Sequence, residues 1–325
     1  MRAIVLHEYG GPDVLTVDEV PDPEPGPEEV LVQVRATALN RADVLQRMGF
    51  YPGPQMPQEI PGMEFAGTVI ALGDRVTERA IGDEVMGIVG GGAYAEQLTV
   101  HERQTMPVPT SVGLDDAAAI PEVWITAFDA LVAQAQLTSG RTALVHAGAS
   151  GVGTAAIQIT KGIGARIAVT ASAGKVDACA ELGADLVVDY RVEDFVAAVL
   201  DFTDGAGADV ILDVIGGDYL ARNLACVRTK GTIIQVGVMG SGAPEIDLGR
   251  LLRGRIRLIG TVLRPRPIDE KVAITQRFAQ EMLPLFDRGS FRPVIDCRFP
   301  LEAIADAHRH MEANANVGKI LVDLA

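Results

Sequence analysis

The sequence predicts an α/β protein with two domains, one built from short, irregular β-strands and the other from a doubly wound parallel sheet covered by helices. Residues 142–263 alternate short, nearly continuous apolar runs with helix-like segments, which is typical of parallel strands buried on both faces. Residues 1–122 instead carry short β-type runs that glycine and proline turns separate. A chain of 325 residues with 48% hydrophobic content is long enough to form two cores.

The β-type runs of the first domain are bounded by residues that favour turns. These runs are Met1–Leu6, Val14–Val20, Glu29–Leu39, Glu64–Leu72, Asp83–Val89 and Ala93–Val100. The turns between them include Gly10-Gly11-Pro12, Gly73-Asp74 and Gly90-Gly91-Gly92. Many short strands with such turns predict an irregular β-barrel-like domain, which we assign to residues 1–122.

The stretch Thr142–Ile159 reads TALVHAGASGVGTAAIQI, in which an apolar strand leads through a glycine-rich turn into a helix. A helix that opens near Val152 directs free backbone N–H groups and the positive end of its dipole toward a pyrophosphate. Ser150 stands where the G-x-G-x-x-G fingerprint has its second glycine, so the loop alone fits either a dinucleotide site or a tight strand–helix turn.

The next strand, Arg166–Thr170, ends where an NAD-binding site places an acidic residue against the ribose 2′-hydroxyl. This chain has Ser172 and Lys175 there, a neutral-to-cationic pair that suits a 2′-phosphate. The sequence therefore favours NADPH over NADH. The alternative is that Ser172 caps the helix that begins near Lys175, whose ammonium is then solvated.

Further strands and helices complete this domain, which we assign to residues 123–263. The strands are Asp185–Asp189, Ala208–Val214, Gly231–Val238 and Arg257–Leu263, and the helices are Asp194–Phe202 and Tyr219–Val227. Glycine-rich turns at Gly216-Gly217 and from Gly237 to Gly242 follow two of the strands. They lie at the carboxyl edge, where ligands of such sheets bind.

The run Arg264-Pro265-Arg266-Pro267 ends this pattern. A helical segment from Glu270 to Phe286, a segment from Arg298 to Met311 and a strand from Lys319 to Leu324 follow. Because the parallel sheet already has six strands, we expect residues 264–325 to complete the first domain.

Charge and composition exclude several functional classes. The formal charge is −15, from 28 basic and 43 acidic residues, which disfavours binding to nucleic acid or to an anionic membrane. No apolar run approaches the ~20 residues of a membrane span, and no signal peptide is evident. The chain has three cysteines, Cys179, Cys226 and Cys297, which are far apart in the sequence. Their odd number and wide spacing argue against disulfides and a cysteine-rich zinc lobe. We expect a cytoplasmic protein.

Four motifs follow one another along the chain: Ala38–Asp43, Pro61–Gly67, Ala118–Pro121 and His146–Ala156. In this order and spacing they resemble the zinc-independent quinone oxidoreductases of the medium-chain dehydrogenase/reductase superfamily. The likeness is closest to the p53-inducible quinone oxidoreductase subgroup, with its HAGxSGVGTAAIQ loop, and it extends to the ending Met311–Lys319. The resemblance implies a GroES-like β-barrel catalytic domain and a Rossmann cofactor domain.

The comparison with zinc-dependent relatives predicts that no catalytic metal is bound. Those relatives carry a catalytic cysteine in the segment of Asn40 and a Gly-His-Glu motif where this chain has Gly62-Met63-Glu64. Asparagine and methionine do not replace a thiolate and an imidazole as zinc ligands. None of the 5 histidines has a second ligand at metal spacing in the sequence, since His308 and His310 fall on different helix faces. We expect Glu64 to stabilise the fold by hydrogen bonding instead.

Without a metal, hydrogen-bond donors must polarise the electron acceptor as hydride arrives. We take Asn40 and Tyr51 as the candidates. The resemblance places the loop Gly49–Pro54, which carries Tyr51, over the nicotinamide, where the phenol could donate to a quinone oxygen. The alternatives are that Asn40 caps the following helix and that Tyr51 is only an apolar wall.

The resemblance also implies the residues that contact the cofactor. These are Asn40, Thr126, Ser150, Gly151 and Val152 near the phosphates and the nicotinamide; Ser172, Lys175 and Tyr190 around the 2′-phosphate and adenosine; Gly216, Gly237 and Val238 at the carboxyl edge; and Leu263 and Asn316 toward the tail. Two of them have simpler explanations, because Tyr190 also suits an exposed position after its strand and Asn316 suits a turn.

The sequence thus predicts an NADPH-dependent reductase that transfers hydride to an ortho-quinone or similar activated carbonyl in a cleft between the domains. One alternative is an enoyl or alkenal (2-alkene) reductase, in which hydride goes to the β-carbon of an enone and the α-carbon takes a proton. A second is an NADPH-responsive binding or structural protein. Because the apolar strand 257–263 leaves an open sheet edge, we expect a homodimer that pairs through it.

Overall fold

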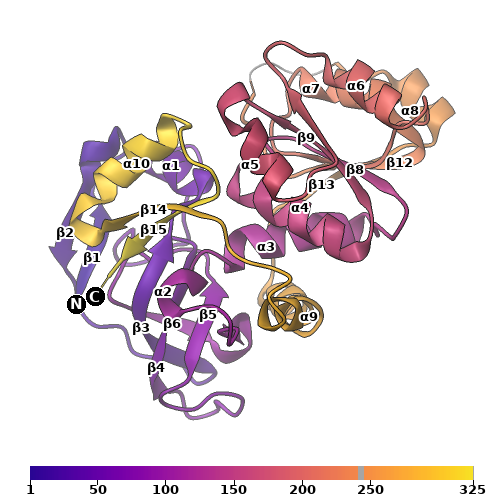
Figure 1. Cartoon of the computed structure of the whole chain (residues 1–325). Coiled ribbons are helices and arrows are strands. Elements are labelled where there is room, and N and C mark those ends of the chain that lie inside the picture. The colour runs from indigo at the N-terminus through magenta and orange to yellow at the C-terminus, as the bar shows by residue number, and fades with distance from the viewer. Residues whose placement is uncertain (241–244, 325) are drawn as a thin grey trace. The chain divides into compact units, whose positions relative to one another are not determined.

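The computed structural model describes residues 1–240 and 245–324 and divides the chain into two compact units (Figure 1). The first unit comprises Met1–Ile125 and Arg264–Ala325, and the second comprises Thr126–Leu263. The end of the predicted turn 237–242 falls outside the described residues.

The first unit contains a seven-stranded mixed sheet and a two-stranded antiparallel one. The larger sheet has the order β14-β15-β3-β4-β5-β7, with β6 also paired to β3. The strands are β1 (Arg2–Leu6), β2 (Leu15–Glu19), β3 (Glu29–Ala38), β4 (Glu64–Leu72), β5 (Glu84–Ile88), β6 (Gln97–His101), β7 (Thr105–Pro107), β14 (Ile295–Pro300) and β15 (Lys319–Asp323). In β3, Val30, Val32 and Val34 are fully buried and alternate with more exposed residues, as expected of a strand with one face toward a core.

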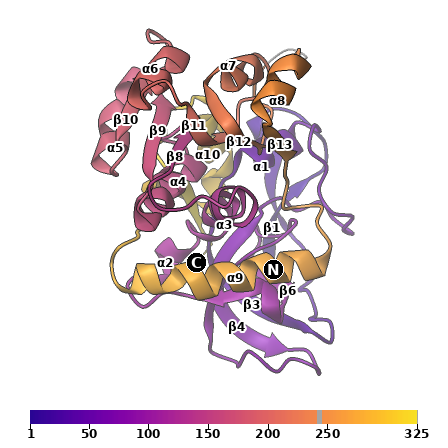
Figure 2. The ribbon, with the colours of Figure 1, turned by 90° about the vertical axis from the view of Figure 1, so that its right-hand side faces the viewer.

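Short helices and one long helix complete the first unit. They are α1 (Arg41–Arg47), α2 (Leu114–Ala117), α9 (Ile268–Asp287), α10 (Ile304–Glu312) and α3 (Pro121–Phe128), which runs on into the second unit. Figure 2 shows α9 along its whole length, and it packs against β7. The single tryptophan, Trp124, packs against Phe286 and Phe291 at ring-centroid distances of 4.5 and 5.1 Å.

The tail adds strands to the sheet of the first unit. β15 pairs antiparallel with β3, so that Leu321 lies opposite Ala38, and β14 pairs parallel with β15. The sequence analysis missed β14: the predicted segment Arg298–Met311 begins inside this strand and continues into α10. Only alternate residues of β14 are half-buried, as in an edge strand, and none is fully buried, so its apolar signal is weak.

The second unit contains a six-stranded parallel sheet in the order β10-β9-β8-β11-β12-β13. Its strands are β8 (Thr142–Val145), β9 (Arg166–Ala171), β10 (Leu186–Asp189), β11 (Ala208–Asp213), β12 (Val227–Gln235) and β13 (Arg257–Gly260). Its helices are α4 (Gly151–Ile163), α5 (Val176–Glu181), α6 (Phe195–Phe202), α7 (Tyr219–Cys226) and α8 (Leu248–Gly254). The chain enters in the middle at β8 and winds to one edge and then the other, which is the doubly wound order that the sequence predicted.

The central strands of this sheet are buried on both faces. All four residues of β8 and all six of β11 are buried, which explains the apolar runs ALV and VIL at their centres. At the edge, β13 is shorter than predicted and ends at Gly260. Of the helices that the structure describes, none has the length and apolar character needed to cross a membrane.

Candidate active site

The turn between β8 and α4 has the geometry of a phosphate-binding loop. Ser150 occupies the N-cap position, and its Oγ accepts a hydrogen bond from the Gly153 N–H at 3.0 Å. A Cβ at Gly148 would lie 2.6 Å from Val169, and one at Gly153 would lie 2.4 Å from two backbone oxygens, so both positions require glycine. The first turn of a helix has N–H groups without partners in the helix, and the 13-residue α4 directs them toward this turn.

The ends of β9 and β10 bring the predicted 2′-phosphate residues to one edge. Asp189 pairs in register with Ala171, and the Tyr190 N–H donates to the Ala171 oxygen at 3.2 Å. Ser172 therefore lies beside Tyr190. Ser172 holds an N-cap position, but its hydroxyl makes no capping hydrogen bond.

Arg191 is a second cation at this edge, and the sequence analysis overlooked it. Its guanidinium lies 5.9 Å from the centre of the Tyr190 ring. Tyr190 is 41% exposed, so a ligand can reach it from solvent. The available signal was the position of Arg191 directly after a parallel strand, at the carboxyl edge.

A pocket of about 280 Å³ opens at the carboxyl edge of the same sheet. Its lining residues are Gly216, Gly217, Leu220, Gln235, Val238, Leu258 and Gly260. The pocket thus brings together Gly216 and Val238, two of the predicted cofactor contacts. Gly237 is not part of this lining, and its backbone oxygen accepts a hydrogen bond from Gln235 Nε2 at 2.6 Å.

A buried polar chain supports the turn at Gly216. His146 Nε2 lies 2.8 Å from Asn223 Oδ1, and Asn223 Nδ2 donates to Asp213 Oδ2 at 2.9 Å. The other carboxylate oxygen of Asp213 accepts the N–H groups of Ile215 and Gly216 at 2.7 and 2.9 Å. Burial lowers the pKa of His146, so the ring is neutral, and this chain of hydrogen bonds orients the backbone of Gly216 at the pocket.

In the first unit, a buried ammonium group joins the ends of three neighbouring strands. Lys319 at the start of β15 donates to Asn40 Oδ1 at 2.7 Å and to the Leu39 oxygen at 2.6 Å, and it forms an ion pair with Glu64 Oε1 at 2.7 Å. Lys319 and Glu64 are only 3% and 0% exposed. Because β3 lies between β15 and β4, these residues are brought together by the sheet order.

The hydrogen bonds of Glu64 confirm its expected role in the fold. Its Oε1 accepts from Asn40 Nδ2 at 2.8 Å, and its Oε2 accepts the Glu122 N–H at 2.8 Å. The sequence analysis did not predict the partner cation. The available signal was the single lysine before the apolar run ILV of this strand, because a buried lysine needs an anion.

The side-chain amide of Asn40 has protein partners at both ends. Its oxygen accepts from Lys319, and its nitrogen donates to Glu64 and, at 3.3 Å, to the Ala38 oxygen. Its backbone N–H donates to Asp43 Oδ2 at 2.8 Å, as in a capping box at the start of α1. These contacts give Asn40 the N-cap position, and its role toward substrate stays a prediction.

Tyr51 is half-buried and faces an arginine. The Arg264 guanidinium lies 5.0 Å from the Tyr51 ring centre, held by hydrogen bonds to the Gly90 oxygen at 2.5 Å and Gln46 Oε1 at 2.7 Å. Burial raises the pKa of Tyr51 while Arg264 opposes the rise, so the phenol is protonated at neutral pH. Its hydroxyl makes no hydrogen bond with any residue that the structure describes, so it can donate to a ligand.

Two predicted cofactor residues lie at the ends of the second unit, and a third lies in the tail of the first. Thr126 and Leu263 are the first and last residues of the second unit. Asn316 belongs to the first unit, in the loop before β15, and its Nδ2 donates to the Gly318 oxygen at 2.9 Å, which fits the turn alternative. Their contacts with a cofactor remain predictions.

Comparisons with known proteins identify the family. Residues 26–110 match the alcohol dehydrogenase GroES-like domain and residues 182–322 match the zinc-binding dehydrogenase family. The quinone oxidoreductase of Pseudomonas aeruginosa is 34% identical over 327 residues, 99% of each chain. The synaptic vesicle membrane protein VAT-1 homolog of Rattus norvegicus is 32% identical over 340 residues, which cover 99% of this chain and 84% of the relative.

Solved structures of related proteins support the same family. The Escherichia coli quinone oxidoreductase complexed with NADPH superimposes with a TM-score of 0.90 at 27% identity, covering 100% of both chains. The CurK enoyl reductase superimposes with a TM-score of 0.89 at 26% identity, and the match covers 100% of this chain and 99% of the enoyl reductase. The fold and these relatives define an oxidoreductase with a GroES-like domain and a Rossmann domain. The chain belongs to the medium-chain dehydrogenase/reductase superfamily, among the relatives of the quinone oxidoreductases.

Proposed function

We propose that this protein is an NADPH-dependent quinone oxidoreductase that works without zinc and reduces an ortho-quinone or a similar activated carbonyl. The observation that carries this proposal is the buried Lys319 ammonium, which occupies the space between Asn40 and Glu64. Asn40 lies in the segment that carries the catalytic cysteine of zinc-dependent relatives, and Glu64 follows Met63, which replaces the histidine of their Gly-His-Glu motif. The name of the Pseudomonas relative and the NADPH in the Escherichia coli structure support the reaction class.

The second unit fits a nicotinamide dinucleotide, which would supply hydride when bound. We assign the pyrophosphate to Ser150, Gly151 and Val152; the 2′-phosphate and adenosine to Ser172, Lys175 and Tyr190; and the remaining contacts to Asn40, Thr126, Gly216, Gly237, Val238, Leu263 and Asn316. The turn at α4, in which Gly148 and Gly153 have no room for a Cβ, and the pocket at Gly216 and Val238 support these assignments.

Polarisation of the acceptor falls to Tyr51 in this account. Its hydroxyl is free to donate, whereas both ends of the Asn40 amide have partners in the protein. Arg264 holds the ring by its face and counteracts the rise of the Tyr51 pKa that burial causes. Charge that develops on the acceptor oxygen would therefore meet a phenol O–H with a cation behind it. Asn40 would fix the strand end next to this site.

The experiment that tests this function measures NADPH oxidation with ortho-quinones, para-quinones, enones and enoyl thioesters, for the unaltered protein and for Tyr51→Phe. We expect ortho-quinones to be the best acceptors and the variant to lose roughly tenfold in kcat, with little change in NADPH binding. Faster turnover of enones or enoyl thioesters would favour the enoyl reductase alternative. NADPH binding without turnover of any acceptor would favour a binding or structural protein.

The cofactor preference depends on Lys175. We expect NADPH to exceed NADH by at least about tenfold in kcat/KM, because a charged hydrogen bond to the 2′-phosphate contributes about 1.5–3 kcal/mol. Lys175→Ala should remove most of this preference while NADH turnover stays the same. Lys161→Ala is the control, since Lys161 pairs with Asp185 at 2.7 Å on the same unit. Equal use of both cofactors by the unaltered protein would contradict the assignment.

The open edge at β13 supports the proposed homodimer. Thr261 donates its N–H to the Gln235 oxygen at 3.0 Å, and because strand residues alternate in direction, the Gly260 N–H points away from β12. Gly260→Pro should remove this outward donor and produce monomers in light scattering. Gly260→Ala keeps the donor, its Cβ meets open space, and it should remain dimeric. A monomeric unaltered protein at micromolar concentration would refute the proposal.

A further inference from the structure

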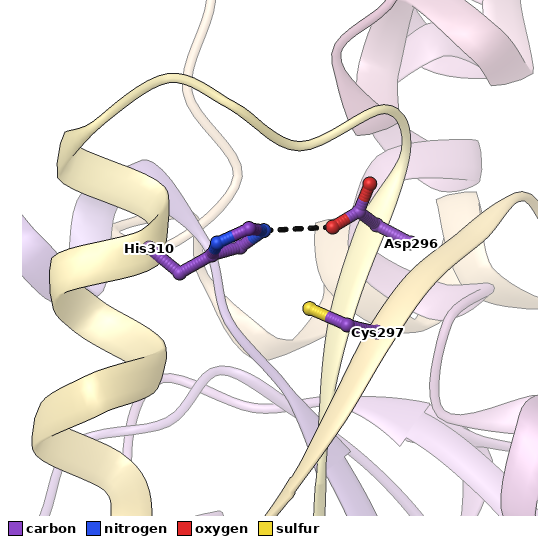
Figure 3. Close-up of side chains that lie close together, drawn as sticks. All are labelled: Asp296, Cys297 and His310. Carbon is purple, nitrogen blue, oxygen red and sulfur yellow. Dashed lines mark hydrogen bonds and ion pairs between the residues drawn. The ribbon is translucent and has the colours of Figure 1, made fainter.

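The tail of the first unit brings together three side chains that carry metal-binding groups. Figure 3 shows Asp296 and Cys297 on β14 and His310 on α10 with their side chains toward one another. The carboxylate oxygen, the thiol sulfur and a ring nitrogen all lie within 4.8 Å of one another. In the described part of the chain, no other group of three such ligands is found.

A bulge in β14 makes this arrangement possible. Ile295 lies opposite Lys319 and Cys297 lies opposite Ile320, so Asp296 is an extra residue without a partner in β15. Consecutive residues of a regular strand point to opposite faces, whereas a bulge redirects one of them. Asp296 and Cys297 can therefore both reach the same side chain on α10.

Two further contacts orient the ligands. Asp296 Oδ1 accepts the Val317 N–H at 3.0 Å, and Asp296 Oδ2 lies 2.7 Å from His310 Nε2. The Phe299 ring lies 6.2 Å from the His310 ring. The Val317 N–H and the Phe299 ring lie outside the ligand set, and contacts of this kind hold carboxylates and imidazoles in the orientations that metal sites need. The side chains of His310 and Asp296 are 32% and 22% exposed, so an ion can reach them from solvent.

The donor set defines the class of ion. One oxygen, one sulfur and one nitrogen suit a borderline-soft divalent cation such as Zn²⁺, and not Mg²⁺ or Ca²⁺, which require oxygen ligands. A tetrahedral zinc ion holds its ligand atoms roughly 3.3–3.6 Å apart. The 2.7 Å contact between Asp296 Oδ2 and His310 Nε2 therefore has to open by about 0.6 Å around an ion, and rotation of these partly exposed side chains can provide such adjustments.

The thiol is protonated when no cation is present. Burial, together with the hydrogen bond to Asp296, raises the pKa of the Cys297 thiol to about 11. A cation reverses this effect, because the ion stabilises the thiolate directly.

We propose that Asp296, Cys297 and His310 form a binding site for one zinc-class divalent cation, with water in the fourth position. The site joins β14 to α10 and, through the Val317 N–H, to the loop before β15, so its cation stabilises the tail of the first unit. It takes no part in the proposed quinone reaction and does not depend on that proposal.

Titration of the reduced, chelator-dialysed protein with Co²⁺ tests the site. We expect one equivalent to bind with a thiolate-to-cobalt absorption band, and Zn²⁺ to displace it. Cys297→Ser should abolish the band. His310→Gln and Asp296→Asn should each weaken Zn²⁺ binding by at least about tenfold in competition with a chromophoric chelator. Zn²⁺ should also raise the melting temperature of the unaltered protein.

His7→Gln is the matched control, because His7 Nε2 lies 2.6 Å from Asp18 Oδ2 but belongs to no group of three metal-binding side chains among the described residues. This variant should bind Zn²⁺ as the unaltered protein does. The proposal is overturned if excess Co²⁺ gives no thiolate band or if the band survives Cys297→Ser. It is also overturned if the His310→Gln variant binds Zn²⁺ with the affinity of the unaltered protein.

Discussion

Lys319→Met is expected to lower the free energy of unfolding of the first unit by about 3–5 kcal/mol, because it leaves the Glu64 carboxylate buried without its cation. Glu64 is 0% exposed, so water cannot replace the ammonium group without opening the structure. The Asn40 and Leu39 oxygens lose their donor at the same time. Each unsatisfied buried acceptor adds to the cost.

Urea unfolding followed by Trp124 fluorescence measures this loss. Trp124 is the single tryptophan and packs against Phe286 and Phe291, so it reports on the first unit. The double variant Lys319→Met with Glu64→Gln should recover much of the stability, since the uncompensated charge is gone.

Arg103→Met is the matched control for this experiment. Arg103 pairs with Glu78 at 3.3 Å, and both side chains are nearly half exposed. Removal of such a surface pair should cost no more than about 1 kcal/mol. A loss at Lys319 that is as small as this would show that Glu64 does not depend on the ammonium group.

His308→Leu is expected to make the first unit more stable in acid. His308 is fully buried on α10, and neither ring nitrogen has a hydrogen-bond partner among the described residues. Burial lowers its pKa to about 3, with Arg47 adding to the shift, whereas the unfolded chain has a value near 6.5. The unfolded state therefore binds the proton first as the pH falls. Stability that is present above pH 6.5 is lost between about pH 6.5 and 3.

At pH 5 the proton binding of His308 lowers the free energy of unfolding by about 2 kcal/mol. Asp43 acts in the opposite direction, because burial raises its pKa to about 6 and the folded protein takes up that proton first. The raw pH profile mixes the two groups, so the measurement is the difference in unfolding free energy between His308→Leu and the unaltered protein at each pH. This difference should shift by about 2 kcal/mol in favour of the variant between pH 7 and 5. A difference that is independent of pH would show that His308 titrates normally in the folded state.

Much of the second unit could be predicted because its signals are local. The apolar runs that became β8 and β11, and the glycines that became the turn before α4, mark buried parallel strands and a tight turn without reference to distant residues. Arg191 was missed because a cation after a strand also suits simple solvation.

The first unit was harder because its site is built from distant segments. Lys319 meets Asn40 and Glu64 only because β15 pairs with β3, and no periodicity in the sequence encodes that pairing. The metal-ligand cluster has the same cause: Asp296 sits in a bulge of a half-buried edge strand, and His310 reaches it from the helix α10. Sequence spacing identifies ligands that lie on one element, not ligands that a strand and a helix bring together.

A single-turnover measurement tests the central claim most directly. Protein is dialysed against a strong chelator, mixed with stoichiometric NADPH and then with an excess of an ortho-quinone, while NADPH absorbance is followed. We predict oxidation of one equivalent of NADPH at a rate that neither the chelator nor added Zn²⁺ changes, even where the metal raises the melting temperature through Asp296, Cys297 and His310. Oxidation that requires Zn²⁺, or none with any ortho-quinone, would contradict a zinc-independent quinone oxidoreductase.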